Sequence, residues 1–256
     1  MRILIIGSDS VSTKILYNSL NDEFKIDMVI LEKEESRFYF IKRRFKKLGV
    51  LKVLDQLIFM STYSKILYYL SRNRITKILH NNNLSDSSIP EHKIKRVHSA
   101  NSNESVIILK KFSVDLIVLS GTRIISKKII NEVNTPIVNI HAGITPNFRG
   151  VHGAYWALVR KEKNLAGVTL HYVDFGVDTG GVISQDLISI TEDDNYSTYP
   201  FLQLSCGINL LKEYITQSNK SLAYNGKFYG SKIYSNQWFH PGFFEYIYNR
   251  IVLGVK

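Results

Sequence analysis

One run of apolar residues, DLIVL from Asp115 to Leu119, constrains the fold more than any other feature of the sequence. It has no polar alternation, and strands of that kind are covered on both faces, as in parallel sheets flanked by helices. A second run, Arg2 to Ile6, ends at Gly7-Ser8-Asp9-Ser10 and leads through a helix-like stretch into a third run, Ile26 to Leu31. This order is the β-turn-α-β opening of a nucleotide-binding-type sheet. We therefore predict an α/β, Rossmann-like fold with a mostly parallel sheet flanked by helices.

The rest of the chain divides into a main part and a tail. We predict that Glu34 to Asn81 is mostly helical and that Tyr199 to Gln217 forms one long helix. The last forty residues are aromatic and irregular, which indicates a small aromatic C-terminal element packed on the main domain. The expected organisation is a main α/β domain over 1–190, followed over 191–256 by a C-terminal helix and the appended aromatic element.

Composition indicates the cellular compartment that we expect for this chain. The single cysteine, Cys206, excludes an internal disulfide and a cysteine-rich metal site. No apolar run reaches the roughly 18 residues that a membrane-spanning helix needs, so no transmembrane segment is expected. The N-terminal MRILIIG begins a strand at once and lacks the features of a secretory signal. Together these observations predict a cytoplasmic protein.

Positive charge is concentrated in one segment. The net charge is +11, and Lys33 to Arg96 contains fifteen Lys or Arg against five Asp or Glu, which gives +10. Such a segment could meet phosphates, anionic lipid or nucleic acid, or it could be a solvated helical face. The sequence leaves the role of this basic segment open.

The segment VNIHAGITPNFRG, Val138 to Gly150, contains the first chemical signal. It begins as a strand, and the strand period of two puts Asn139 and His141 on the same side. Both stand at the carboxyl end of the strand, which is where open α/β sheets bind their ligands. The glycine pattern GxGxxG is absent because Gly7 stands alone, so a dinucleotide site is poorly supported.

The second signal is GVTLHYVDFGVDTGGVI, Gly167 to Ile183. A strand that carries His171 runs into a glycine-rich turn with Asp174 and Asp178. Taken singly, His171 is expected to be a structural histidine, and an aspartate in such a turn is usually a turn former. The combination of both segments in this order points instead to one catalytic centre.

The two segments together resemble the signature of the folate-dependent formyltransferases. The common family pattern NxHPSLLPxxRG appears here as NIHAGITPNFRG, with Pro-Ser replaced by Ala142-Gly143. The second family pattern, HxVxxxxDxG, matches at His171, Val173, Asp178 and Gly180. The resemblance covers roughly Met1 to Ile188, and it is specific only between Asn139 and Asp178.

The resemblance implies an enzyme that takes the formyl group of 10-formyltetrahydrofolate and places it on an amine. Asn139, His141 and Asp178 would be catalytic. Asn139 would stabilise a developing oxyanion, His141 would take the amine proton or stabilise that oxyanion, and Asp178 would orient His141. No metal is required, and the sequence contains no obvious metal cluster.

The family's pterin pocket would be lined here by two loops. Arg123, Ile124 and Ile125 would contribute the first wall, and Val173 and Asp174 the second. Core packing is the alternative interpretation for Ile124 and Ile125.

The chain looks most similar to the sugar-nucleotide N-formyltransferases of surface-polysaccharide biosynthesis, because of its HAGITP loop and compact aromatic tail. The implied acceptor is the amine of a nucleotide-linked amino deoxysugar, contacted by Ser8, Asp9, Arg149 and Tyr155. The resemblance also suggests a homodimer. The sequence does not define the sugar, the nucleotide, the position of the amine or the oligomeric state.

Three other interpretations stay open. The acceptor could be glycinamide ribonucleotide or methionyl-tRNA, although no nucleic acid partner is expected, because the segment after Ile188 is aromatic rather than basic. The chain could be a non-catalytic relative that binds a nucleotide sugar or RNA. It could also associate with a membrane surface through Arg37 to Lys47.

Overall fold

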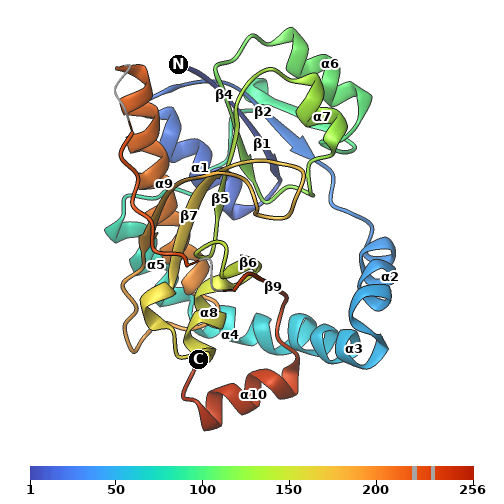
Figure 1. The fold of residues 1–256 in the computed structure, drawn as a ribbon, viewed down its shortest axis with the longest axis vertical. Helices are drawn as coiled ribbons and strands as arrows, with labels where there is room; N and C mark the ends of the chain where they lie inside the picture. Colours follow the sequence, from blue (N-terminus) through green and yellow to red (C-terminus); the bar gives the residue numbers. More distant parts are fainter. Residues whose placement is uncertain (221–223, 232–233) are drawn as a thin grey trace.

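In the computed structural model, which describes residues 1–220, 224–231 and 234–256, a seven-stranded sheet forms the centre of the fold (Figure 1). Its strand order is β3-β2-β1-β4-β5-β7-β8. The strands are β1 (Arg2–Ser8), β2 (Lys25–Glu32), β3 (Ile94–Val97), β4 (Leu116–Ser120), β5 (Ile137–His141), β7 (Gly167–Tyr172) and β8 (Val182–Leu187). The first five are mutually parallel, and β7 runs antiparallel to both of its neighbours. The predicted mostly parallel α/β fold is confirmed.

Helices cover both faces of the sheet. One face packs against α1 (Val11–Asn21) and α9 (Tyr199–Asn219), and the other against α6 (Asn103–Lys111) and α7 (Lys127–Glu132). Ile3 and Ile5 point into the first layer and Leu4 and Ile6 into the second, and all four are fully buried. This burial on both faces is the reason that the strands are apolar without alternation.

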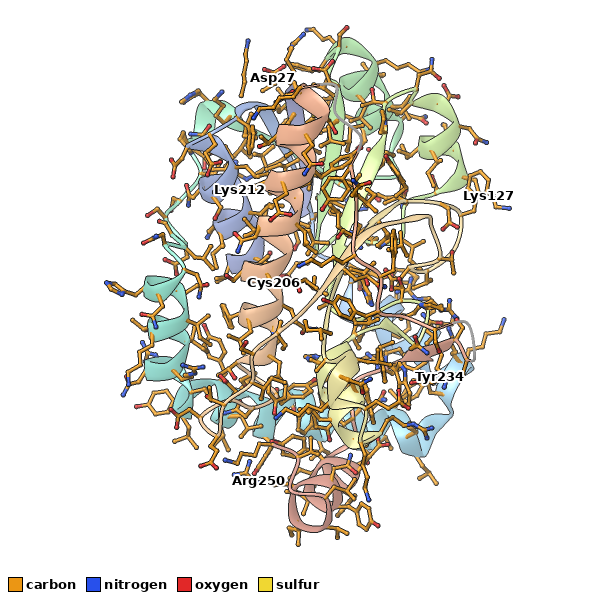
Figure 2. The ribbon with its side chains drawn as sticks, turned by 60° about the vertical axis from the view of Figure 1, so that its left-hand side comes forward. Asp27, Lys127, Cys206, Lys212, Tyr234 and Arg250 are labelled. Atoms are coloured by element: carbon orange, nitrogen blue, oxygen red, sulfur yellow. The ribbon has the colours of Figure 1, made fainter. Side chains whose placement is uncertain are left out.

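Helix α9 belongs to the same core as the sheet. Its Ile208, Leu211 and Ile215 are buried together with Val168 and Leu170 of β7. Figure 2 shows α9, which carries Cys206 and Lys212, lying along the sheet. A division of the chain at residue 190 therefore separates α9 from the core into which its side chains pack.

The predicted helical stretch between Glu34 and Asn81 is a chain of short helices. They are α2 (Arg37–Leu48), α3 (Val50–Ile58), the π-helical turn η1 (Phe59–Tyr63), α4 (Ser64–Leu70) and α5 (Arg72–Asn81). The remaining elements are η2 (Glu91–Lys93), β6 (Phe148–Gly150), α8 (Gly153–Val159), η3 (Lys163–Leu165), β9 (Asn236–Trp238) and α10 (Phe243–Val252). Strands β6 and β9 pair in parallel as a separate two-stranded sheet.

The aromatic residues of the tail complete a third core, apart from the two that line the sheet. Tyr246 of α10 packs against Phe59 and Tyr63, and it stacks on Tyr155 with ring centroids 5.8 Å apart. Trp238 stacks on Trp156 at 4.9 Å. The tail is thus joined to the helices of the 37–81 segment and to α8. Within the described residues, no helix is long and apolar enough to cross a membrane.

Candidate active site

Asn139 and His141 lie at the carboxyl end of β5, as the strand period predicted. They share their side of the strand with Ile137, which packs in the layer beneath α6 and α7. The His141 side chain is only 4% exposed, whereas Asn139 is half-buried. The His141 imidazole is therefore enclosed by neighbouring residues, whereas the Asn139 amide is partly accessible to solvent.

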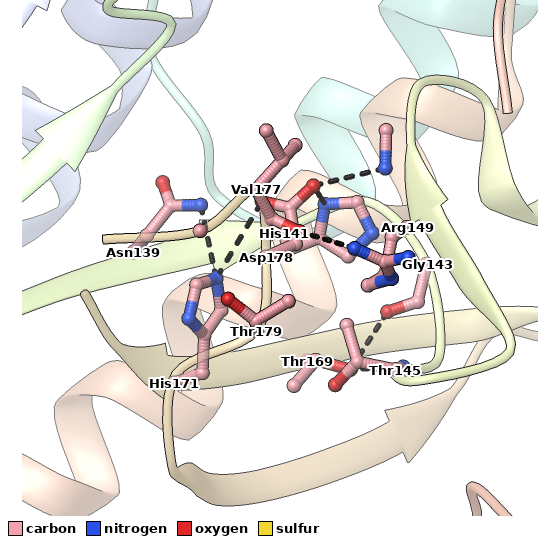
Figure 3. Close-up of polar contacts among 12 residues, drawn as sticks. Asn139, His141, Gly143, Thr145, Arg149, Thr169, His171, Val177, Asp178 and Thr179 are labelled. Atoms are coloured by element: carbon pink, nitrogen blue, oxygen red, sulfur yellow. Dashed lines mark hydrogen bonds and ion pairs between the residues drawn. The ribbon is translucent and has the colours of Figure 1, made fainter. Parts of the chain in front are cut away.

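Asp178 reaches this pair from the turn between β7 and β8 (Figure 3). Its Oδ2 lies 3.4 Å from His141 Nδ1 and also accepts the backbone N–H of Gly150 at 2.9 Å. Asp178 takes a φ of +52°, a conformation that aspartate and asparagine adopt more readily than most residues. Asn139, His141 and Asp178, predicted as one catalytic set, are close together.

The hydrogen bonds of His141 limit how its ring carries protons. Its Nε2 lies 2.7 Å from the carbonyl oxygen of Phe148, which can only accept, so Nε2 carries the proton in the neutral ring. Nδ1 is then the free basic nitrogen, and it faces Asp178. A proton taken up at Nδ1 would point at the carboxylate.

Gly143 makes this arrangement possible. A β-carbon at residue 143 would lie 2.3 Å from the Phe148 carbonyl oxygen and 2.8 Å from His141 Nε2. The common family pattern has Pro-Ser where this chain has Ala142-Gly143, and the contact between His141 and Phe148 leaves no room for a serine side chain at residue 143. Thr169 Oγ1 supports the same loop by donating to the Gly143 carbonyl at 2.7 Å.

His171 is part of this cluster, although sequence reasoning treated it as structural. The antiparallel register places it directly opposite Asn139. Its Nδ1 donates to the Tyr172 carbonyl at 2.7 Å, so Nε2 of the neutral ring accepts from the Asn139 amide at 3.2 Å. Burial lowers the pKa of His171, which favours that neutral ring. His171 Nε2 also lies 3.8 Å from Asp178 Oδ1.

The residues predicted to hold the folate occupy two loops that meet. Lys127, just after the first loop, lies with its ammonium 5.3 Å from the ring centroid of Phe175 in the second. Ile124 and Phe175 are exposed, at 60% and 53%. Ile125 is buried in the core, in agreement with the alternative interpretation of core packing. Val173 is partly buried and packs against the same core.

Arg123 is held by residues around the end of β2, whereas Asp174 bonds within its own turn. Glu32, a buried residue at the end of β2, accepts the backbone N–H of Arg123 at 2.6 Å and that of Ala100 at 2.9 Å. The carboxylate of Asp174 accepts from the Gly176 backbone at 3.0 Å and from the Thr179 hydroxyl at 2.7 Å. These bonds fix the shape of both walls. Glu32 gave no sequence signal, because its partners lie far along the chain.

The predicted substrate residues do not lie together. Ser8 is beside Gly121, at the end of β1, and exposed Asp9 forms an ion pair with Lys14 at 3.6 Å. Arg149 donates to the Val177 carbonyl at 3.1 Å and to Ser235 Oγ at 3.0 Å, which ties the loop after β5 (142–150, here called the catalytic loop because the proposed catalytic residues border it) to the Asp178 turn.

The prediction for Tyr155 is wrong. Its side chain is fully buried in the aromatic core, and its hydroxyl accepts a hydrogen bond from Asn249. Helix α8 turns this residue away from the site, so a bound substrate could not contact it.

A cavity of about 380 Å³ opens on the other face of β5. Ile140 and Ala142 line it, together with Ser10 and Ser12 at the start of α1 and Gln203 of α9. Gln203 is 1% exposed, and its Oε1 has no hydrogen-bond partner within the part of the chain that the structure describes. The cavity therefore offers, among the described residues, one unpaired acceptor, Gln203 Oε1, and the hydroxyls of Ser10 and Ser12, which hydrogen-bond to each other, close to the end of β5. Sequence reasoning did not identify Gln203, because its helix shows no motif.

Across residues 1–220, 224–231 and 234–256, no group of three or more His, Cys, Asp or Glu could hold a metal ion. The chemistry of the cluster is that of an amide donor, an imidazole base and a carboxylate. Such a set can stabilise an oxyanion and move a proton at the carboxyl edge of an α/β sheet.

Comparison with known proteins assigns the family. The sequence profile described as "Formyl transferase" matches residues 70–201, about half of the chain, and this chain belongs to the formyl transferase family. The match includes Asn139, His141 and Asp178. The resemblance seen in the sequence is thus confirmed.

Two curated relatives differ in what they formylate. The chain is 32% identical over 117 residues to methionyl-tRNA formyltransferase of Pelotomaculum thermopropionicum, a match that covers 45% of this chain and 37% of the relative. It is 38% identical over 91 residues to phosphoribosylglycinamide formyltransferase of Bacillus subtilis, covering 35% and 46%. The matches thus span less than half the length of either relative.

Solved structures share the fold over most of the chain. A sugar N-formyltransferase of a Shewanella species superposes with a TM-score of 0.55 at 17% identity, covering 93% of this chain and 76% of that one. The N-formyltransferase of Helicobacter canadensis, solved with folinic acid and dTDP-3-aminofucose, gives 0.52 at 19%, covering 92% and 70%. At these identities the likeness concerns the fold.

Proposed function

We propose that this chain transfers the formyl group of 10-formyltetrahydrofolate to the amine of a nucleotide-linked amino deoxysugar. The observation that carries the proposal is the cluster at the end of β5, where the Asp178 carboxylate lies 3.4 Å from the basic nitrogen of His141 and Asn139 is beside them. The family membership supports the reaction class.

Each of the three residues has one task in this reaction. Formyltetrahydrofolate, when bound, supplies the formyl carbon that the amine takes. The Asn139 amide has two N–H groups, and one of them faces His171, so the second can donate to the formyl oxygen as it gains negative charge. As the amine nitrogen bonds to the formyl carbon, His141 Nδ1 accepts the proton that the amine loses, and Asp178 stabilises the imidazolium formed in this way. The bond between the formyl carbon and the folate nitrogen then breaks, His141 returns the proton to that nitrogen, and tetrahydrofolate leaves.

The loops around Ile124 and Phe175 fit a flat aromatic ring system. Both side chains are exposed and apolar, and the two loops approach each other at Lys127 and Phe175. Apolar walls with a few fixed polar groups are the usual lining of such a pocket. The backbone bonds from Glu32 and within the Asp174 turn hold these walls in place. Arg123, Ile124, Val173 and Asp174 would form the pocket, with Ile125 supporting it from the core.

A nucleotide-linked amino sugar suits the other side of the site. The cavity beside β5 offers the Ser10 and Ser12 hydroxyls and the unpartnered Gln203 Oε1. Ser8 and Asp9 come directly before Ser10, which lines the cavity, and Arg149 lies in the loop after β5. The dTDP-3-aminofucose complex of the Helicobacter canadensis protein supports this substrate class, because that protein shares the fold.

Glycinamide ribonucleotide is the second candidate acceptor. The match to the Bacillus subtilis phosphoribosylglycinamide formyltransferase favours it, since 38% identity falls within a stretch of 91 residues. Methionyl-tRNA is a further candidate acceptor, because the chain also matches a methionyl-tRNA formyltransferase.

The test is a panel of amines. The purified chain is mixed with 10-formyltetrahydrofolate and, in turn, with several amino-sugar nucleotides, glycinamide ribonucleotide and methionyl-tRNA, and tetrahydrofolate release is followed. We expect turnover with an amino-sugar nucleotide. If only glycinamide ribonucleotide or methionyl-tRNA is formylated, the proposed acceptor is wrong. If no amine is formylated, the proposed reaction is wrong.

A further inference from the structure

One end of the molecule exposes several large apolar side chains on neighbouring helices, and such clusters often mark an interaction surface. Helix α3 contributes Leu51, Leu54 and Ile58, at a spacing that puts them on one helical face. Leu51 is 85% exposed. The inward face of the same helix buries Val53 and Gln56. The outward apolar residues are therefore not needed for packing within the chain.

Helix α10 shows the same pattern more strongly. Its inward face buries Tyr246 and Asn249. Its outward face carries Phe244, Tyr248, Ile251 and Val252, of which Ile251 is 77% exposed. A helix that is apolar on both sides is usually covered on both sides.

The two apolar faces belong to one end of the fold. The backbone N–H of Phe244 donates to Asp55 of α3 at 3.3 Å, and the Phe243 ring packs edge-on against Tyr63. Figure 1 shows α3, α4 and α10 gathered at the lower end of the molecule. Helix α4 adds exposed Tyr69 and Leu70.

Basic side chains surround this apolar end. Residues 37–81 contain eleven Lys or Arg and one acidic residue, Asp55. The exposed members include Lys42, Arg43, Lys46, Lys52, Lys65 and Arg72, and α10 adds Arg250, which is at the lower end in Figure 2. Asp55 accepts the backbone N–H of Phe244, and Glu245 of α10, the other carboxylate of these helices, accepts the backbone N–H of Gly242 at 3.3 Å.

We propose that the end formed by α2, α3, α4 and α10 docks on the surface of an anionic phospholipid membrane. Exposed Leu, Ile and Phe would enter the boundary between headgroups and acyl chains, tyrosines would lie at headgroup level, and Lys and Arg would contact headgroup phosphates. This combination of an apolar helical face with a basic border is characteristic of helices that lie in a membrane interface.

Charge distinguishes this occupant from a second copy of the chain. A symmetric dimer through the same face would bring its basic borders against each other, with one acidic residue per copy in 37–81 to offset them. An anionic bilayer neutralises the same charges. The proposal does not depend on the enzymatic reaction.

The test is flotation of the purified full-length chain with lipid vesicles at low salt. One set contains phosphatidylcholine alone, and the other contains phosphatidylglycerol in addition. We expect flotation only with the anionic vesicles and its loss at high salt. Lys42→Gln with Lys46→Gln should weaken vesicle affinity by roughly five-fold for each charge removed. Phe244→Ser with Ile251→Ser should weaken it by more than about tenfold.

The matched control lies on α6, away from this end. Ile107 is 67% exposed and Lys111 is exposed, so Ile107→Ser with Lys111→Gln removes similar groups elsewhere. This variant should float like the wild type. No flotation at low salt, or an equal loss in the control, overturns the proposal. It is also overturned if the wild type is a dimer that Phe244→Ser with Ile251→Ser converts to a monomer, because a second copy would then cover the face.

Discussion

Asp178 joins two segments that are separate in the sequence. One carboxylate oxygen faces His141, and the same oxygen accepts the Gly150 backbone N–H. The residue is therefore both part of the proposed chemistry and part of the loop that shapes the site. A useful variant must remove the charge and keep the hydrogen bond.

Asp178→Asn meets that condition. Asparagine tolerates the φ of +52° and its Oδ1 can still accept from Gly150, so we expect the free energy of unfolding to change by less than about 1 kcal/mol. The rate of formyl transfer should fall by roughly a hundredfold or more, because the imidazolium loses its counter-charge. Steady-state kinetics and urea unfolding of the same preparation measure both. A kcat close to wild type would contradict the role given to Asp178.

His171 contacts Asn139, and we expect it to position that amide rather than to touch a substrate. Replacing it with leucine removes the acceptor for the Asn139 amide, so kcat should fall by about tenfold while KM for the formyl donor changes little. His171→Gln keeps an acceptor and should recover part of the rate. Unchanged kcat in His171→Leu would show that the amide needs no such partner.

At the level of elements, α2 and α3 are joined to the tail by a partly buried polar network. Arg44 donates to Gln56 at 2.8 Å, Gln56 donates to the His240 carbonyl at 2.6 Å, and the Tyr196 hydroxyl lies 2.9 Å from His240 Nδ1. Burial, with a smaller effect from Arg44, lowers the pKa of His240 to about 4. Burial also lowers the pKa of His152, which stacks on Tyr196.

This network predicts a pH-dependent stability. The unfolded chain takes up a proton at His240 near pH 6.5, whereas the folded chain does so only near pH 4, so the free energy of unfolding falls as pH drops through that window. The upper bound is about 3 kcal/mol, which solvent screening reduces. Urea unfolding between pH 7 and pH 5 measures the slope, above the range in which ordinary carboxyls titrate. His240→Gln should flatten the slope in part, leaving the contributions of His152 and His171, whose pKa values burial also lowers. A wild-type stability that stays constant over this range would contradict the network.

Helix α10 offers a test of the aromatic core with its own control. Tyr246 is fully buried among Phe59, Tyr63 and Tyr155, so Tyr246→Ala should lower the free energy of unfolding by about 3–5 kcal/mol. Tyr248 in the same helix is 59% exposed, and Tyr248→Ala should change it by less than about 0.5 kcal/mol. Denaturant unfolding of both variants decides the point. Similar losses in the two would mean that the tail does not share the core.

The elements that carry the chemistry could be read from local patterns, and the contacts between them could not. Apolar runs located β1, β4 and β5, and the strand period paired Asn139 with His141. The contact of His171 with Asn139 depends on the antiparallel register of β5 and β7. The bond from Glu32 to Arg123 joins residues 91 positions apart. Tyr155 was misassigned because sequence position near the catalytic loop does not show which face of α8 is buried.

At the level of the whole molecule, the sheet brings together residues from one strand and two loops at one edge. Strand β5 supplies Asn139 and His141, the β7–β8 turn supplies Asp178, and the loop after β4 supplies Ile124. Strand β9 then pairs with β6 of the catalytic loop, so the tail supports the site that it borders. We propose that this assembly formylates an amino-sugar nucleotide.

The most direct measurement is the mass of the nucleotide sugar after incubation with the chain and 10-formyltetrahydrofolate, with wild type, His141→Ala and Asp178→Asn compared at equal concentration. We expect the wild type to convert the amine to a formamide, which adds one carbonyl group to the mass. We expect a rate at least a hundredfold lower in both variants. No formamide from any amino-sugar nucleotide, or formamide made as fast by the variants as by the wild type, would refute the proposed reaction.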